Sequence, residues 1–145
     1  MANMSDEVRL CILAIAKSKS FFAKVDNEGA DHYDKNLMLQ SPNFKSAVFI
    51  DKVTGVSKAF GDFSYLKLAV HPDSFKTELV NPAFGVEDYI SSQSKVNRHH
   101  SSNYRGGNFP NDIPGKNEPY GKCYKVLNLD ALATLLAGLA ERPDV

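Results

Sequence analysis

The sequence predicts an α+β fold, a single antiparallel sheet of about four strands packed against N- and C-terminal helices, with a long irregular loop before the last strand. Apolar residues recur at helical spacing near both ends of the chain, and strand-like segments lie between them without a helical crossover. The chain has 145 residues, of which 43% are hydrophobic and 23% charged. This composition excludes disordered, collagenous and disulfide-scaffold proteins, so we expect residues 1–145 to form a single α+β domain.

The first helix is predicted to begin at Ser5, because Ser5 followed by Asp6 and Glu7 has the composition of an N-cap and an acidic first turn. Apolar residues then recur three and four positions apart and predict a helix of about five turns. The residues on this face are Val8, Cys11, Ile12, Ile15 and Phe22. The polar stretch from Asp26 to Lys35 predicts a loop.

Three strands are predicted in the middle of the chain. Residues 47–50 and 56–60 are apolar runs on either side of turn-forming residues 51–55, and this pattern is typical of a hairpin. Residues 65–70 alternate between apolar and other side chains, which predicts a third strand with one buried face. Pro72 should end that strand, because proline cannot donate a hydrogen bond to the sheet.

A short helix is predicted over residues 73–80, and alternation over residues 120–126 predicts the fourth strand. Asn128 then has the position of an N-cap for a C-terminal helix, which Gly138 should weaken slightly. The apolar face of that helix is formed by Leu129, Leu132, Ala133, Leu136, Leu139 and Ala140.

The overall charge gives no field that would attract nucleic acid or an anionic membrane, because 17 Lys and Arg balance 17 Asp and Glu. The longest apolar run is too short to cross a bilayer, and Asp6 and Glu7 do not suit the positive region of a secretory signal. Cys11 and Cys123 lie in apolar segments and are predicted to be buried free thiols. We therefore expect a cytoplasmic protein with no membrane contact.

The motifs of the common cofactor enzymes do not occur in the sequence. It has no P-loop, no dinucleotide-binding glycine pattern, no His-Glu-x-x-His and no Gly-x-Ser-x-Gly, and its cysteine and histidine spacing fits no zinc site. Residues 31–34 include possible metal ligands, but their place in a polar loop explains them. We expect a binding protein rather than an enzyme, with no cofactor and no metal.

The unusual feature is the segment from Ser91 to Pro119, which has almost no apolar periodicity. Irregular connections of this length inside a domain are usually either functional or disordered. Residues 95–125 contain six Lys and Arg against two acidic residues, a local excess of four positive charges. The sequence therefore predicts a basic loop, residues 95–116, that contacts an anionic or protein partner.

Six residues of this loop are predicted to bind nucleic acid or another phosphate-bearing ligand: Arg98, His99, His100, Asn103, Tyr104 and Arg105. Guanidinium groups bind phosphate in a bidentate manner, and a tyrosine ring can stack on a base. In the alternative interpretation the loop is structural and folds back onto the core through Tyr104, Phe109 and Ile113. The function expected first is that of a small cytoplasmic binding or accessory protein.

A metal-independent nuclease or phosphodiesterase is the second function. His71 ends a predicted strand and could exchange protons together with His99 or His100 if the loop folds over that edge of the sheet. Adjacent side chains of an extended chain point to opposite faces, so at most one of His99 and His100 is expected to take part.

The sequence leaves two further interaction surfaces as alternatives. The protein could be a homo-oligomer, for example a homodimer, with Leu10, Leu13 and Phe21 as its apolar anchors. If instead Tyr120, Lys122 and Tyr124 face solvent, they would form an aromatic and basic platform for single-stranded nucleic acid.

Overall fold

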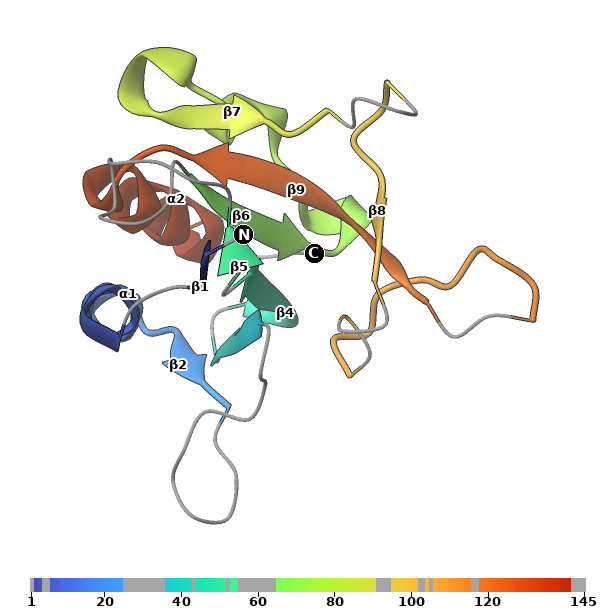
Figure 1. Cartoon of the computed structure of the whole chain (residues 1–145), viewed down its shortest axis with the longest axis horizontal. Helices are drawn as coiled ribbons and strands as arrows, with labels where there is room; N and C mark the ends of the chain where they lie inside the picture. Colours follow the sequence, from blue (N-terminus) through green and yellow to red (C-terminus); the bar gives the residue numbers. More distant parts are fainter. Residues whose placement is uncertain are drawn as a thin grey trace.

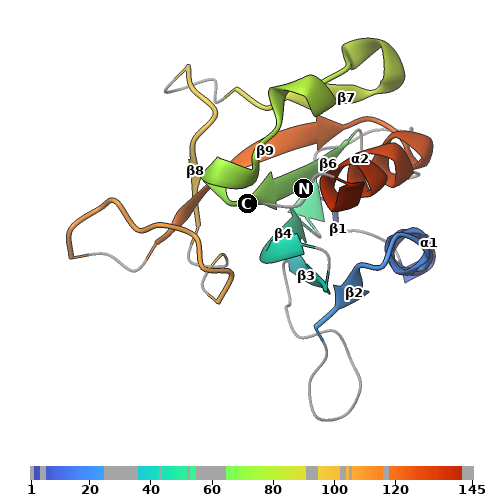
Figure 2. The same cartoon turned by 180° about the vertical axis from the view of Figure 1, so that it is seen from behind.

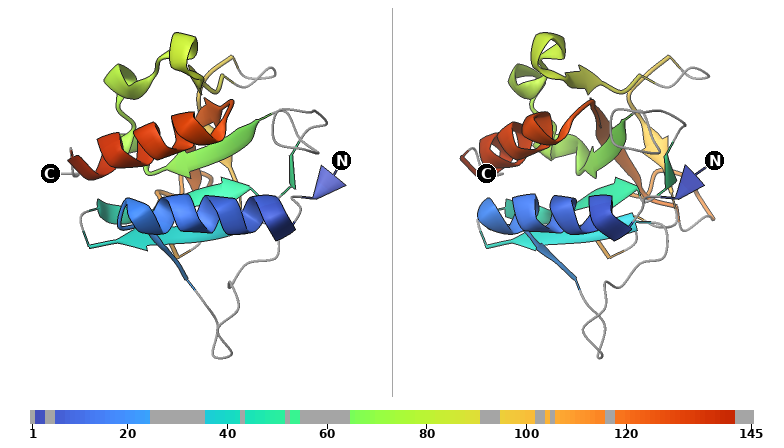
Figure 3. Two further views of the ribbon diagram at one scale, coloured as in Figure 1. Left: turned by 90° about the vertical axis from the view of Figure 1, so that its left-hand side faces the viewer. Right: turned by 60° about the vertical axis from the view of Figure 1, so that its left-hand side comes forward.

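An antiparallel sheet of seven strands carries helices α1 (Asp6–Ser18) and α2 (Leu129–Glu141) on one face (Figures 1 and 3). The computed structural model describes residues 2–3, 6–24, 36–42, 44–51, 53–54, 65–90, 95–101, 104, 106–115 and 118–141. The strands are β2 (Phe22–Ala23), β3 (Asn36–Ser41), β4 (Phe44–Asp51), β6 (Leu66–Val70), β7 (Val86–Asp88), β8 (His99–His100) and β9 (Tyr120–Val126). Their spatial order is β2-β3-β4-β6-β9-β7, and β8 also pairs with β9. The short strands β1 (Ala2–Asn3) and β5 (Val53–Thr54) form a separate pair.

The α+β class is as predicted, but the expected count of about four strands is wrong, because the sheet has seven. β3 is apolar on both faces, with Leu37 and Leu39 buried on the helix side and Met38 on the other, so it lacks the alternation that marks a strand. β2, β7 and β8 have only two or three residues each, too few to show a period in the sequence. These short strands exist because a neighbouring strand offers hydrogen bonds.

Two of the predicted segments lie outside the described residues: the second strand of the expected hairpin, residues 56–60, and the loop over residues 26–35. The first strand of that hairpin belongs to β4, which pairs with β3 on one side and with β6 on the other.

Helix α1 is shorter than the predicted five turns, since it spans 13 residues and ends at Ser18. Ser20 adopts a left-handed conformation, with φ 66°. The Phe21 amide then donates to the carbonyl of Ala16 at 2.9 Å, and the Ser20 amide donates to that of Lys17 at 3.0 Å. This is a Schellman cap, which usually has glycine where Ser20 stands, so the sequence contains no clear stop signal.

Helix α2 begins where the sequence places it. The Ala131 amide donates to Oδ1 of Asn128 at 2.7 Å, which confirms the N-cap. Gly138 has a packing role that the sequence does not reveal, because a Cβ there would lie 2.6 Å from Cδ2 of Leu79.

The helix predicted over residues 73–80 is wrong, because the structure has three separate 3-10 turns: η1 (Pro72–Ser74), η2 (Thr77–Leu79) and η3 (Pro82–Phe84). The backbone is extended at Phe75, with ψ 120°, and this lets the Phe75 ring stack on Tyr124 with centroids 4.5 Å apart. A continuous helix would not allow that contact, so tertiary packing overrides the local pattern.

The face of the sheet opposite the helices has its own apolar cluster, called here the second-face cluster. Its buried members are Met38, Ala47, Phe49, Ala69, Tyr104, Phe109 and Cys123. Tyr104 and Phe109 come from the irregular segment, and both rings contact Phe49, at centroid distances of 5.2 and 5.3 Å. The irregular segment therefore covers this face of the sheet, on the side away from α1 and α2 (Figure 2).

The two cysteines differ in burial. Cys123 is buried as predicted, but Cys11 is exposed, because Ile12 and Ala16 occupy the inner side of α1. Within the described ranges, no helix has both the length and the apolar character needed to cross a membrane.

Candidate functional site

The two histidines of β8 point to opposite faces of the sheet, because they pair with consecutive residues of β9. His99 donates from Nε2 to the carbonyl of Tyr89 at 2.8 Å, and its ring meets the Tyr89 ring edge-on. His100 donates from Nε2 to Oδ1 of Asp112 at 2.7 Å. The two imidazoles therefore belong to different sites.

Arg98 and His100 share one carboxylate, that of Asp112. Nη1 of Arg98 lies 2.8 Å from Oδ2 of Asp112, and the guanidinium lies over the Tyr120 ring, 4.5 Å from its centroid. The hydrogen bond from His100, followed by the charges of His100 and Arg98, lowers the pKa of the Asp112 carboxyl despite some desolvation. Arg98 and His100, which were predicted to bind an external anion, therefore already contact a carboxylate of their own loop.

The other predicted loop ligands do not form a described site. Asn103 and Arg105 lie outside the described residues. Tyr104 is 1% exposed in the second-face cluster, so its ring is not available to stack on a base in this arrangement. Phe109 is buried beside it, as the structural interpretation of the loop expects, whereas Ile113 is half-buried and belongs to neither apolar cluster among the described residues.

His71 does not pair with the β8 histidines. Its Nδ1 accepts a hydrogen bond from the Asp73 amide at 3.0 Å, and its ring contacts the Phe109 ring. Among the described residues, no hydrogen bond or ring contact joins His71 to His99 or His100. The geometry therefore gives no support to a two-histidine phosphodiesterase.

A metal site also finds no support among the described residues, where no three His, Cys, Asp or Glu side chains come together in a suitable group. The polar cluster at residues 31–34 lies outside the described ranges.

The predicted platform of Tyr120, Lys122 and Tyr124 is interrupted by burial. Tyr124 is 0% exposed, and its hydroxyl accepts from the amide of Lys76 at 2.8 Å. Burial raises the pKa of Tyr124, while its backbone contact with Lys76 acts in the opposite direction. The ammonium group of Lys122 lies over the ring of Phe75, 5.8 Å from the centroid.

The anchors predicted for oligomer formation are mostly used inside the chain. Phe21 is fully buried and Leu13 is packed against the helix-side core, so only Leu10, at 58% exposure, is free to face a partner.

A different set of basic and aromatic residues comes together on the second face, called here the tyrosine–lysine face: Tyr65, Lys67, Tyr89 and Lys125. Lys67 of β6 and Lys125 of β9 are directly paired in the sheet. Residues so paired lie on the same face. Lys67 neighbours Ala69 of the second-face cluster at a two-residue spacing, so this face is the one away from the helices.

Each lysine of the tyrosine–lysine face lies over a tyrosine ring. Nζ of Lys67 lies 5.5 Å from the Tyr89 centroid, and Nζ of Lys125 lies 4.7 Å from the Tyr65 centroid. The two tyrosine hydroxyls are 2.9 Å apart and hydrogen-bonded, and their rings meet edge-on. All four side chains are half-buried, so their positions are held by contacts rather than by solvent alone.

His99 borders the tyrosine–lysine face through its contact with the Tyr89 ring, whose centroid is 4.9 Å away. Burial lowers the pKa of the His99 imidazole, and the positive charge of Lys67 lowers it further, against the effect of the hydrogen bond to Tyr89. Burial and the Lys67 ammonium group therefore both favour the neutral imidazole.

Asn97 fixes the position of this edge of the sheet. Its side-chain oxygen accepts from the Cys123 amide at 2.7 Å, and its Nδ2 donates to the Cys123 carbonyl at 2.9 Å. Strand β7 pairs with residues 124–126 of β9, and β8 pairs with residues 120–121. The Asn97 side chain therefore bonds to β9 at a position between these two strands. Because Asn97 is held here, the strand β8 that follows it places His99 next to Tyr89.

Sequence reasoning missed this face for a clear reason. The alternation of residues 65–70 places Tyr65, Lys67 and Ala69 on one side, but nothing local shows that Lys125 is their neighbour. Tyr89 follows a three-residue strand with no pattern of its own.

The chain matches no protein-family model, and no curated protein or solved structure is significantly similar to it.

Proposed function

We propose that this protein is a small binding module that holds a phosphate-bearing ligand, such as a single-stranded nucleic acid, on the tyrosine–lysine face. The observation that carries the proposal is the direct pairing of Lys67 with Lys125 on adjacent strands. The proposal keeps the anionic partner expected from the sequence and moves the contact from the arginines of the basic loop to the sheet.

The pairing is unfavourable without a ligand. Side chains directly opposite on antiparallel strands have Cβ atoms about 5 Å apart, and like charges there destabilise the sheet. In the same row, Glu87 of β7 is paired with Lys125, so the row of three described residues keeps one net positive charge. An anion bound between the two ammonium groups would remove their repulsion.

The surrounding groups suit phosphate. Each ammonium carries three donors, and charge-assisted bonds from lysine to phosphate oxygens are among the stronger hydrogen bonds in proteins. The Tyr65 and Tyr89 hydroxyls, which are hydrogen-bonded to each other, add neutral donor groups beside the two ammonium groups. The site therefore combines positive charge with neutral donors on a rigid sheet.

The basic loop takes part through His99 rather than through Arg98. Arg98 is already paired with Asp112, whereas His99 borders the tyrosine–lysine face. We also propose a cytoplasmic location, because both cysteines are free thiols, as is usual in a reducing compartment.

The test is a fluorescence titration of a labelled oligothymidylate, with inorganic phosphate as a competitor, against Lys67→Gln, Lys125→Gln and Lys122→Gln. Lys122 lies on the same strand as Lys125 but contacts Phe75, on the helix side, so it is a matched control. Each of the first two variants should weaken binding and lower the slope of log affinity against log salt by about 0.7, the value for one phosphate contact on a single strand.

Competition by phosphate alone would indicate a small phosphate ligand at the same site. Equal losses in all three variants, or unchanged binding in Lys67→Gln and Lys125→Gln, would refute the proposed site.

A further inference from the structure

A row of charged residues crosses the tyrosine–lysine face, and its two ends differ in sign. β6, β9 and β7 lie side by side (Figure 1), and Lys67, Lys125 and Glu87 stand directly opposite one another in these strands. Side chains in such positions share a face, and their Cβ atoms are about 5 Å apart from one strand to the next. A ligand that lies along the row therefore meets two ammonium groups and then a carboxylate.

The carboxylate of Glu87 is not used by the lysine opposite it. Nζ of Lys125 lies over the ring of Tyr65, which directly precedes β6, 4.7 Å from the centroid. In the part of the chain that the structure describes, the Glu87 side chain makes no hydrogen bond and no ion pair, although it is half-buried. An ionised carboxylate is an acceptor only, so this group can take a hydrogen bond from a donor of the ligand.

The ammonium group of Lys67 lies toward the β7 side of the row. Lys67 reaches across β9 to the ring of Tyr89, with Nζ 5.5 Å from the centroid. Tyr89 follows Glu87 by two residues, a spacing of about 7 Å on the same face of an extended chain. A phosphate that is held by this ammonium group therefore lies on the side of the face where Glu87 stands.

The aromatic rings of this face already have contacts of their own. The Tyr65 ring has the Lys125 ammonium group over it, and the Tyr89 ring contacts Lys67, Tyr65 and His99. Many proteins that bind single strands hold the bases by stacking them on exposed rings. Here the rings are engaged by lysines, so the groups that remain for recognition are the charges, which suit the phosphate and the sugar of a ligand.

We infer that the tyrosine–lysine face selects ribose over deoxyribose, so that its ligand is single-stranded RNA. The inference rests on the proposed function, because the phosphate must occupy the site between Lys67 and Lys125. The 2′-hydroxyl and the 3′-phosphate of RNA are attached to neighbouring ribose carbons, so a phosphate on the lysines brings this hydroxyl to Glu87. The hydroxyl donates to the carboxylate, whereas deoxyribose leaves the carboxylate beside the phosphate without a donor.

Three oligouridylates of equal length test the inference: the ribose form, the 2′-deoxy form and the 2′-O-methyl form. All three carry the same base and the same phosphates, and the 2′-O-methyl form keeps the 2′ oxygen but cannot donate from it. In fluorescence titrations at one salt concentration, the ribose form should bind about tenfold more tightly than either of the others, as expected for one hydrogen bond to a charged acceptor.

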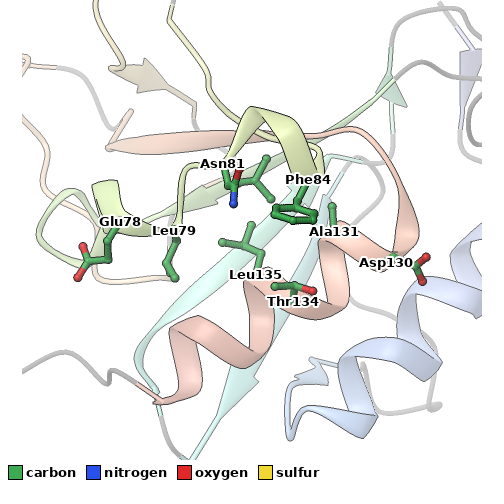
Figure 4. A pocket seen from close by; sticks show the side chains of 9 residues that line it. Glu78, Leu79, Asn81, Phe84, Asp130, Ala131, Thr134 and Leu135 are labelled. Carbon is green, nitrogen blue, oxygen red and sulfur yellow. The ribbon is translucent and has the colours of Figure 1, made fainter.

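A variant at Glu87 and a matched control assign the preference. Glu87→Ala should give the ribose and deoxyribose forms equal affinity, and it should bind the deoxyribose form at least as tightly as the wild-type protein does, because a negative charge is removed. Asp130→Ala removes the same charge on the helix side, where Asp130 borders a cavity of about 450 Å³ and its carboxylate is turned outward (Figure 4). This control should keep the tenfold preference.

Equal binding of the ribose and deoxyribose forms, equal binding of the ribose and 2′-O-methyl forms, or a preference that survives Glu87→Ala would overturn the inference. The proposed phosphate site would stand in each of these cases if Lys67→Gln weakened the binding of both forms. Unchanged binding of all three oligouridylates in Lys67→Gln and Lys125→Gln would refute the proposed site, and the ribose selectivity with it.

Discussion

Gly121 provides a direct test of how the irregular segment packs against the sheet. A Cβ at this position in β9 would lie 2.7 Å from Cε2 of Phe109 and 2.7 Å from the carbonyl oxygen of Val70. The ring could shift, but the carbonyl belongs to the last residue of β6, which is paired with Lys122. Gly121→Ala therefore meets one obstacle that can move and one that cannot.

The expected cost follows from these two contacts. Overpacking of a well-packed site usually costs about 1–3 kcal/mol, and the fixed carbonyl places Gly121→Ala at about 2–3 kcal/mol. For a chain of this length the entropy of unfolding converts each kcal/mol into a fall in Tm of about 3 °C. We expect Tm to fall by about 6–9 °C, with a matching fall in the urea midpoint at constant m-value.

A double-mutant cycle with Phe109→Ala assigns the cost. Phe109→Ala alone should lower stability by about 3 kcal/mol, because Phe109 is 8% exposed and the ring leaves a cavity. In that background Gly121→Ala should cost less, with a coupling of about 0.5–2 kcal/mol, because only the Val70 carbonyl still obstructs the methyl group. Gly115→Ala is a comparison for backbone strain without a clash: nothing lies within 4 Å of its Cβ position, but its φ of 78° disfavours alanine, so it should cost about 1 kcal/mol with no contact to Phe109.

The reasoning would be refuted if Gly121→Ala cost less than about 0.5 kcal/mol, within the range of an ordinary surface substitution. Additive effects of Gly121→Ala and Phe109→Ala would also refute it, because additivity would mean that the ring does not lie over Gly121.

Two further predictions concern the edge of the tyrosine–lysine face. Asn97→Ala should lower the free energy of unfolding by about 1–3 kcal/mol and speed hydrogen exchange of the Cys123 amide, because that amide loses the Asn97 acceptor and the Cys123 carbonyl is left with the donor amide of Tyr89; unchanged exchange would contradict this. The pKa of His99 is lowered from 6.5 in the folded state, so the unfolded chain takes up a proton first as the pH falls. The stabilising contribution of His99 is therefore present above pH 6.5 and is lost as the pH falls toward the folded pKa. The free energy of unfolding, measured by urea titration at several pH values, should fall over this range, and His99→Gln should remove that fall.

Local patterns were sufficient where a segment's own residues decide its structure. The cap at Asn128 and the apolar stripe of α2 follow from hydrogen bonds and packing within one helix, and the alternation of residues 65–70 matches β6. The irregular segment before β9 was also visible as an anomaly in the sequence, together with the aromatic residues that attach it to the sheet.

The rest depends on partners that are distant along the chain. Strands of two or three residues, such as β7 and β8, form only because β9 offers hydrogen bonds, and Ser20 ends α1 because Phe21 must enter the core. Arg98 looks like a free anion ligand in the sequence, but the fold brings Asp112 to it.

The sequence by itself determined the α+β class, the two helices and the place of the irregular segment, because spacing, capping and turn residues act over a few neighbouring positions. Only the tertiary structure decided which charged side chains lie next to one another. The pairing of Lys67 with Lys125, and of each with a tyrosine ring, depends on the register of β6 against β9. That register is set by burial of the whole sheet, which no local pattern encodes.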